Sequence, residues 1–246
     1  MESGDDKQAI RERIWRLLEE TGAALPPGAW GRIPNFKGAR EAALRLFSLD
    51  EWRNATFIKV NPDSPQRWVR LRALEEGKLL LMPTPRLRRG FLLIDPSAIP
   101  RSLYRLASTI RGAFRAGRLL KTVSDLTRHV ERIDLVVEGS VAVNRWGERL
   151  GKGEGYGDLE FAILLETSLL DREAPIATTV HDLQVLPHRL PQDDHDVPVD
   201  IISTPTRLIR AAERPPRPAG LLPDRITPEK LREIPILSEV LQLYKR

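Results

Sequence analysis

Short, uniformly apolar runs recur along the chain and alternate with segments of helical periodicity. KLLLMP, at residues 78–83, is one such run, and its lack of alternating polar residues is typical of a strand that is buried on both faces. Strands separated by helices predict a mostly parallel sheet covered by helices, so we predict an α/β fold. The other strand-like runs are TFIKV (56–60), IDLVVEGSVAV (133–143), IATTVH (176–181) and VPVDII (197–202).

The intervening segments carry helix signals. The first, residues 5–21, places Ile10 and Ile14 at helical spacing, and Lys7 and Arg11 lie four residues apart, so they share one face. Cap residues followed by proline mark further helix starts. We expect helices over 39–47, from Ser64-Pro65 to Gly77, over 158–166, and beginning at Thr204-Pro205 and Thr227-Pro228-Glu229.

The length of 246 residues fits one large α/β domain or two small ones. ERPPRPAGLLPD, at residues 213–224, is rich in proline, and only a short tail follows it. We therefore expect an extended connector on the surface instead of a domain boundary. The prediction is a single domain over residues 1–246, with an N-terminal helix at 5–21 and a proline-rich C-terminal extension at 211–246.

Composition excludes several classes of site. The chain has no cysteine, which excludes disulfides, thiolate zinc sites and a cysteine nucleophile, and fits the cytoplasm, where we expect the protein. No apolar run is long enough to span a membrane, and the polar start MESGDDKQAI does not resemble a signal peptide. The net charge of +5 suits the phosphates of a nucleotide or of nucleic acid. Basic and aromatic residues do not alternate, so a single-strand binding face is not favoured.

The loop GKGEGYGDLE, at residues 151–160, has glycine at every second position up to Gly157 and then an acid, Asp158, at the expected helix start. Glycines let the backbone approach a ligand, and their N–H groups, with a helix N-terminus, can bind phosphate oxygens. The loop lacks the GK[ST] of a P-loop and the context of a dinucleotide fingerprint. From these residues alone, a phosphate-binding loop and a flexible surface loop are equally supported.

Three motifs resemble the 5-formyltetrahydrofolate cyclo-ligase (5,10-methenyltetrahydrofolate synthetase) family. VVEGSVAVNRWGERLGKGEGYGDLE (136–160) is similar to its strand followed by G-x-R-[LM]-G-x-G-x-G-Y-Y-D. Lys7 and Arg11 match a K-x-x-x-R pair on its first helix, and HDVPVD places Asp196 and Asp200 on the acids of N-D-x-x-V-D. RIPNFKG, NPDSPQ and PTPRLR resemble a divergent branch, the methenyltetrahydrofolate synthase domain-containing proteins.

This resemblance implies a three-layer, Rossmann-like fold with a mostly parallel sheet, of the NagB/RpiA/CoA-transferase-like kind. It also implies a monomeric enzyme that uses ATP and Mg²⁺ to convert 5-formyltetrahydrofolate into 5,10-methenyltetrahydrofolate, with release of ADP and phosphate. No catalytic side chain is assigned, because such chemistry needs positioning and charge neutralisation more than a nucleophile. The implied metal ligands are Asp158 and Asp196. The implied ATP-binding residues are Lys7, Arg11, Arg149, Gly151, Lys152, Gly153, Gly155, Tyr156 and Gly157, and the substrate-binding residues are Glu154, Tyr156, Arg86 and Arg88.

The loop departs from the family pattern at three positions. Gly157 replaces the second tyrosine, Leu159 stands where arginine often follows, and Glu154 is a carboxylate that repels phosphate unless a base neutralises it. Two alternatives therefore stay open beside the cyclo-ligase. One is a non-catalytic protein that binds a nucleotide or nucleic acid on the same fold, and the other is an enzyme with a different acyl or sugar-phosphate substrate.

Overall fold

A computed structural model describes residues 6–244. Its main sheet has eight strands in the order β11-β10-β8-β5-β1-β2-β3-β4. The five central strands, from β10 to β2, pair in parallel, whereas β3, β4 and β11 add antiparallel edges. The strands are β1 Phe57–Val60, β2 Leu79–Pro83, β3 Phe91–Ile94, β4 Arg118–Leu120, β5 Leu135–Glu138, β8 Ile176–Thr179, β10 Ile201–Ser203 and β11 Leu208–Arg210.

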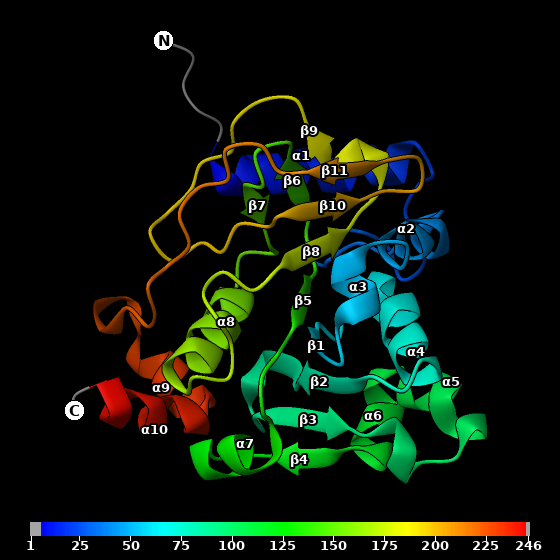
Figure 1. Cartoon of the computed structure of the whole chain (residues 1–246). Helices are drawn as coiled ribbons and strands as arrows, with labels where there is room; N and C mark the ends of the chain where they lie inside the picture. Colours follow the sequence, from blue (N-terminus) through cyan, green and yellow to red (C-terminus); the bar gives the residue numbers. More distant parts are fainter. Residues whose placement is uncertain (1–5, 245–246) are drawn as a thin grey trace.

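Helices cover both faces of this sheet, as Figure 1 shows. One face packs against α2 Ala39–Leu46, α3 Asp50–Asn54, α4 Arg67–Glu75, α5 Tyr104–Ala107 and α6 Ile110–Ala116. The other packs against α7 Val123–His129, α8 Tyr156–Glu166 and α10 Pro235–Tyr244, with α9 Pro228–Glu233 beside them. The apolar runs become strands buried on both sides because each face has its own helical layer. The predicted α/β fold with a mostly parallel sheet is therefore confirmed.

A second, small sheet has three strands in the order β7-β6-β9, which are Arg149–Leu150, Ala142–Asn144 and Val185–Leu186. Helix α1, Lys7–Glu20, packs its apolar stripe on this sheet through Ile10, Ile14 and Leu18, which contact a cluster that includes Ala142. Figure 1 shows α1 beside β6, β7 and β9 at one end of the molecule. The predicted first helix is confirmed from Lys7 to Glu20, while Met1–Asp5, Lys245 and Arg246 lie outside the described residues.

Two sequence-based expectations were wrong in detail. Residues 133–143 are not one strand, because β5 ends at Glu138 in the main sheet and the chain then enters β6 in the small sheet. Thr204-Pro205 starts a turn and not a helix, with the Thr204 N–H donating to the Arg207 carbonyl at 2.9 Å. That turn returns the chain as the antiparallel strand β11. The helix start at Thr227 is confirmed, since its side chain caps α9.

The strand order identifies where a ligand is expected. From β1 the chain builds outward through β2, β3 and β4, then returns to place β5 on the other side of β1. In open α/β sheets, ligands bind beyond the carboxyl ends of the strands where the order reverses in this way. Here that position lies after Val60 on β1 and Glu138 on β5. No helix among the described residues is long and apolar enough to cross a membrane.

Candidate active site

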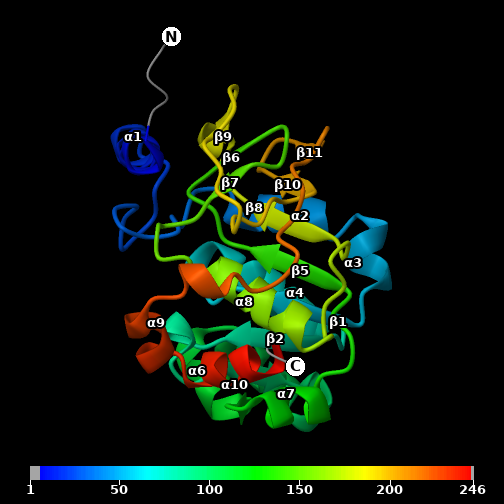
Figure 2. The ribbon, with the colours of Figure 1, turned by 90° about the vertical axis from the view of Figure 1, so that its left-hand side faces the viewer.

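One large cavity, of about 1070 Å³, opens at this position. Its walls come from α1, the loops after β1 and β5, the glycine loop with the start of α8, and residues of the C-terminal segment that contains α9. Figure 2 shows α1 and α9 on the same side of the molecule, one above the other. The cavity is lined by every residue that the resemblance implied as a ligand contact: Lys7, Arg11, Arg86, Arg88, Arg149, Gly151, Lys152, Gly153, Glu154, Gly155, Tyr156, Gly157, Asp158 and Asp196.

Two glycines of the glycine loop are required by the backbone conformation. Gly153 has φ of +98° and Gly155, the residue that precedes α8, has φ of +70°, both in the region that side chains rarely adopt. A Cβ on Gly153 would also lie 3.3 Å from the Arg11 guanidinium. Gly157 lies inside the first turn of α8, over the Glu138 carboxylate. The amides of this first turn have no intrahelical acceptor, so the loop presents N–H groups to an anion.

Lys7 and Arg11 of α1 both line the cavity, and Arg11 contacts the glycine loop. Arg11 Nε donates to the Gly151 carbonyl at 2.7 Å. Lys7 Nζ pairs with Asp193 at 2.6 Å and also with Asp196. Burial works against the charge of Lys7, but the hydrogen bonds to the two aspartates outweigh it and raise the Lys7 pKa above its ordinary value. The helical spacing thus brings two cations to the cavity, and their contact with nucleotide phosphates stays a prediction.

Asp196 belongs to a group of possible metal ligands. One donor atom from each of Asp193, His195 and Asp196 lies within 4.8 Å of the others. Asp158 is close to this group, because its Oδ1 accepts from the Val197 N–H at 3.1 Å. Burial raises the Asp158 pKa, and the nearby Asp196 adds to the rise against the opposing charge of Arg149. Mg²⁺ prefers oxygen ligands, so the carboxylates of Asp193, Asp196 and Asp158 fit the ion that the resemblance implies, whereas His195 offers only a ring nitrogen.

Arg149 holds the base of the loop. It is buried, and it donates to the carbonyls of Gly139 and Val197 while pairing with Asp158 at 3.1 Å. These bonds tie the loop, the end of β5 and the metal-ligand segment together. Direct contact between Arg149 and a phosphate stays a prediction.

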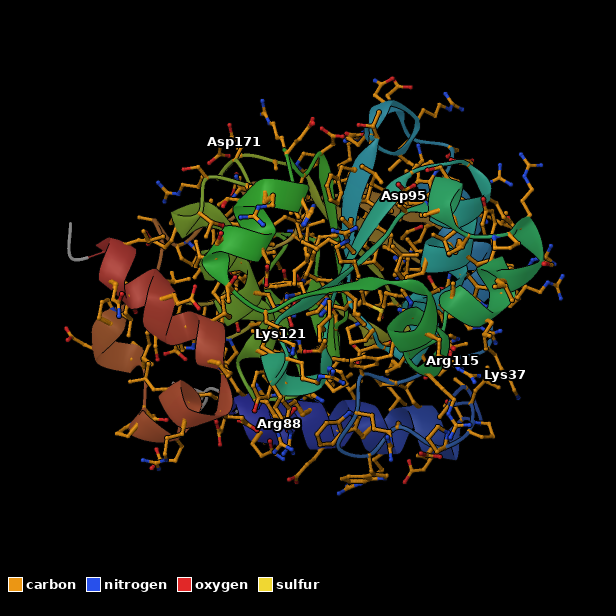
Figure 3. The ribbon with its side chains drawn as sticks, turned by 90° about the horizontal axis from the view of Figure 1, so that it is seen from below. Lys37, Arg88, Asp95, Arg115, Lys121 and Asp171 are labelled. Atoms are coloured by element: carbon orange, nitrogen blue, oxygen red, sulfur yellow. The ribbon has the colours of Figure 1, made fainter. Side chains whose placement is uncertain are left out.

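The cavity rim neutralises Glu154, the acid that departs from the family pattern. Lys152 pairs with its carboxylate at 2.8 Å and Arg86 at 3.3 Å. Burial would raise the Glu154 pKa, but the hydrogen bond and charge of Lys152, with the charge of Arg86, lower it overall. Arg88 instead pairs with Glu233 of α9 at 3.0 Å, and Figure 3 shows it beside the C-terminal helices. Substrate contacts by Glu154, Arg86 and Arg88 stay predictions.

A buried charge cluster at the cavity floor was missed by the sequence reasoning. Lys59 of β1, 1% exposed, pairs at 2.5 Å with Glu138 of β5 and at 2.5 Å with Glu160 of α8. Burial and the neighbouring Glu138 raise the Glu160 pKa to about 7 against the attraction of Lys59. Oε2 of Glu138 is buried without a hydrogen-bond partner among the described residues. A lysine inside the apolar run TFIKV was the available sequence signal, since lysine is almost never fully buried unless paired.

A sequence model of the 5-formyltetrahydrofolate cyclo-ligase family matches residues 3–205. The chain belongs to the 5-formyltetrahydrofolate cyclo-ligase family. It is 42% identical over 250 residues to a mouse (Mus musculus) protein named methenyltetrahydrofolate synthase domain-containing protein, covering 100% of this chain and 66% of the mouse protein. The human (Homo sapiens) protein of the same name is 41% identical over 242 residues, covering 96% of this chain and 62% of that protein.

The chain thus spans less than two thirds of the length of these family relatives. Among solved structures, the 5,10-methenyltetrahydrofolate synthetase of Aquifex aeolicus is similar with a TM-score of 0.52. That match has 19% sequence identity and covers 89% of this chain and 99% of the other. At this identity the likeness supports the fold alone.

Proposed function

We propose that the protein is an ATP- and Mg²⁺-dependent cyclo-ligase that converts 5-formyltetrahydrofolate into 5,10-methenyltetrahydrofolate with release of ADP and phosphate. The observation that carries the proposal is the gathering, in one cavity at the point of strand-order reversal, of the α1 cations, the glycine loop and the aspartate group. These parts come from sequence positions far apart, and family membership gives the reaction class.

Phosphate binding would use the free amides at the start of α8 together with Lys7, Arg11 and Lys152. The carboxylates of Asp196 and Asp193 would hold Mg²⁺ together with waters, and Asp158, which pairs with Arg149, would lie beside them. Lys7 shares Asp196 with the metal in this scheme, so metal binding would release Lys7 toward the phosphates.

When bound, Mg-ATP supplies the γ-phosphate that converts the formyl oxygen into a leaving group, so that the second folate nitrogen can close the ring. The task of this chain is to hold the two ligands in contact and to neutralise charge at the transferring phosphate. Lys7, once released from Asp196, and Arg11 would neutralise that charge. Glu154 does not oppose it, because Lys152 and Arg86 already compensate its carboxylate.

The test is to incubate the protein with ATP, Mg²⁺ and 5-formyltetrahydrofolate and to follow methenyl absorbance and ADP release. We expect Lys7→Met to weaken Mg-ATP binding at least tenfold, about 1.4 kcal/mol. The matched control is Lys37→Met, because Lys37 is exposed and does not line the cavity. Figure 3 shows Lys37 well away from Arg88. Mg-ATP binding without turnover would support a non-catalytic nucleotide-binding protein, and neither binding nor turnover would refute both.

A further inference from the structure

The cavity extends beyond the part of the chain that the family model matches. That match ends at residue 205, yet residues between 218 and 230 form a wall of the same cavity. We call residues 218–233 the closing segment. Its cavity-lining members are Pro218, Gly220, Leu221, Leu222, Arg225, Ile226, Thr227 and Lys230.

The closing segment is fixed at both ends. Before it, Arg217 is buried, pairs with Asp200 and donates to the carbonyls of Arg172 and Ala174. Within it, the Leu221 N–H donates to Glu166 at the end of α8 at 2.8 Å. After it, α10 is held by three fully buried residues of the main core, Ile236, Leu237 and Val240. The proline-rich segment is thus anchored to the body of the protein.

Helix α9 holds one residue of the glycine loop at two points. Lys230 Nζ lies 3.4 Å from the centre of the Tyr156 ring, and Glu233 accepts a hydrogen bond from the Tyr156 hydroxyl. Lys230 and Glu233 are three residues apart, so they share a face of the helix. Thr227 caps the helix and Pro228 follows at its first turn, which fixes where α9 begins.

The same two side chains extend the contact to the rest of the cavity rim. Lys230 Nζ also donates to the Glu154 carbonyl at 2.9 Å, so it bonds both to the loop backbone and to the Tyr156 ring. Glu233 pairs with Arg88 at 3.0 Å and with Arg86 at 3.8 Å. Burial lowers the Lys230 pKa, and the charges of Glu233 and Glu154 oppose that fall.

A loop with glycine at every second position has much conformational freedom to lose when it binds a ligand. Holding such a loop in its bound shape beforehand removes part of that cost and strengthens binding. We propose that Lys230 and Glu233 are positioning residues by which the closing segment holds the glycine loop ready for a polyphosphate ligand. The identity of that ligand as Mg-ATP rests on the proposed function, whereas the restraint on the loop does not.

The test compares Lys230→Met, Lys230→Arg and the wild type by two measurements. Hydrogen exchange of the amides of Gly153, Glu154 and Gly155 in the ligand-free protein reports the restraint. Calorimetry with Mg-ATP reports its effect on binding. We expect Lys230→Met to speed exchange and to weaken Mg-ATP about tenfold, or about 1.4 kcal/mol, and Lys230→Arg to restore both, because arginine keeps the charge and the donors.

Arg232→Met is the matched control, because Arg232 lies on the same helix, is exposed and, within residues 6–244, pairs only with Glu229. Thermal unfolding of each variant checks that the fold is intact. If the wild type binds Mg-ATP and Lys230→Met binds it equally well, the inference is overturned while the proposed function stands. If the wild type does not bind Mg-ATP, the proposed function fails, and the exchange rates alone decide whether α9 restrains the loop.

Discussion

Replacing Lys59 by methionine would remove the cation from the buried cluster and leave its shape nearly unchanged. Glu138 and Glu160 would then face each other without the ammonium that now lies 2.5 Å from each. Both side chains are almost completely buried, with 2% and 5% exposure, so water cannot replace the lost partner. Breaking a buried ion pair by removing one partner costs roughly 3–5 kcal/mol. For a chain of this size, that loss lowers the unfolding temperature by roughly 6–20 °C.

The loss in the free energy of unfolding caused by Lys59→Met should depend on pH in a defined direction. The Glu160 pKa is raised from 4.5 to about 7 in the folded protein, chiefly by burial. A carboxyl with a raised folded-state pKa contributes stability that is present below its unfolded pKa and is lost as pH rises through the folded value. Removing the attraction of Lys59 raises that pKa further. The deficit of the variant should therefore be smaller at pH 5 than at pH 8.

Urea unfolding of the wild type and of Lys59→Met, at pH 5 and at pH 8, measures the free energy of unfolding of each protein. Lys78→Met is the control, because Lys78 is also buried but donates to the Ala55 carbonyl and pairs with a Glu76 carboxylate that is 29% exposed. Its cost, roughly 1–3 kcal/mol for an unsatisfied carbonyl, should hardly change with pH. A Lys59→Met deficit below 1 kcal/mol at pH 8, or one of equal size at both pH values, would refute the reasoning.

Two further substitutions, one of them with a matched control, test the loop and the anchor of the closing segment. Gly153→Ala should weaken Mg-ATP binding about tenfold, since φ of +98° strains an L-residue and the new Cβ would press on Arg11. Gly77→Ala, with φ of +77° and open space around it, should lower thermal stability without changing affinity, and equal binding losses in both would count against the loop's role. Arg217→Ala should lower the unfolding free energy by roughly 1–3 kcal/mol, because it leaves the Arg172 and Ala174 carbonyls without their donor, while the partly exposed Asp200 keeps Arg214 as a partner. A change under 1 kcal/mol in urea unfolding would show that the anchor is not needed.

Local sequence patterns determined the elements and much of the candidate site. The alternation of apolar runs with helical segments predicted the sheet, because a strand buried on both faces needs no polar alternation. The spacing of Lys7 and Arg11 predicted a shared helix face, whereas the glycine pattern alone supported a phosphate-binding loop and a flexible surface loop equally, and only the family resemblance favoured the first. Each of these depends on neighbours within a few residues, which is why it can be predicted without tertiary structure.

Only the tertiary structure decided which of these elements meet. Residues 133–143 look like one strand because both sheets bury apolar side chains alike, and only the packing divides them at Gly139. Glu138 and Glu160 resemble ordinary charged residues in the sequence, and only the packing of three separate elements places each carboxylate 2.5 Å from the Lys59 ammonium. Lys230 reaches Tyr156 only because α10 and Arg217 hold the closing segment against α8. Contacts between residues that are far apart in the sequence depend on how the helical layers pack on the sheets. A local sequence pattern does not predict that packing.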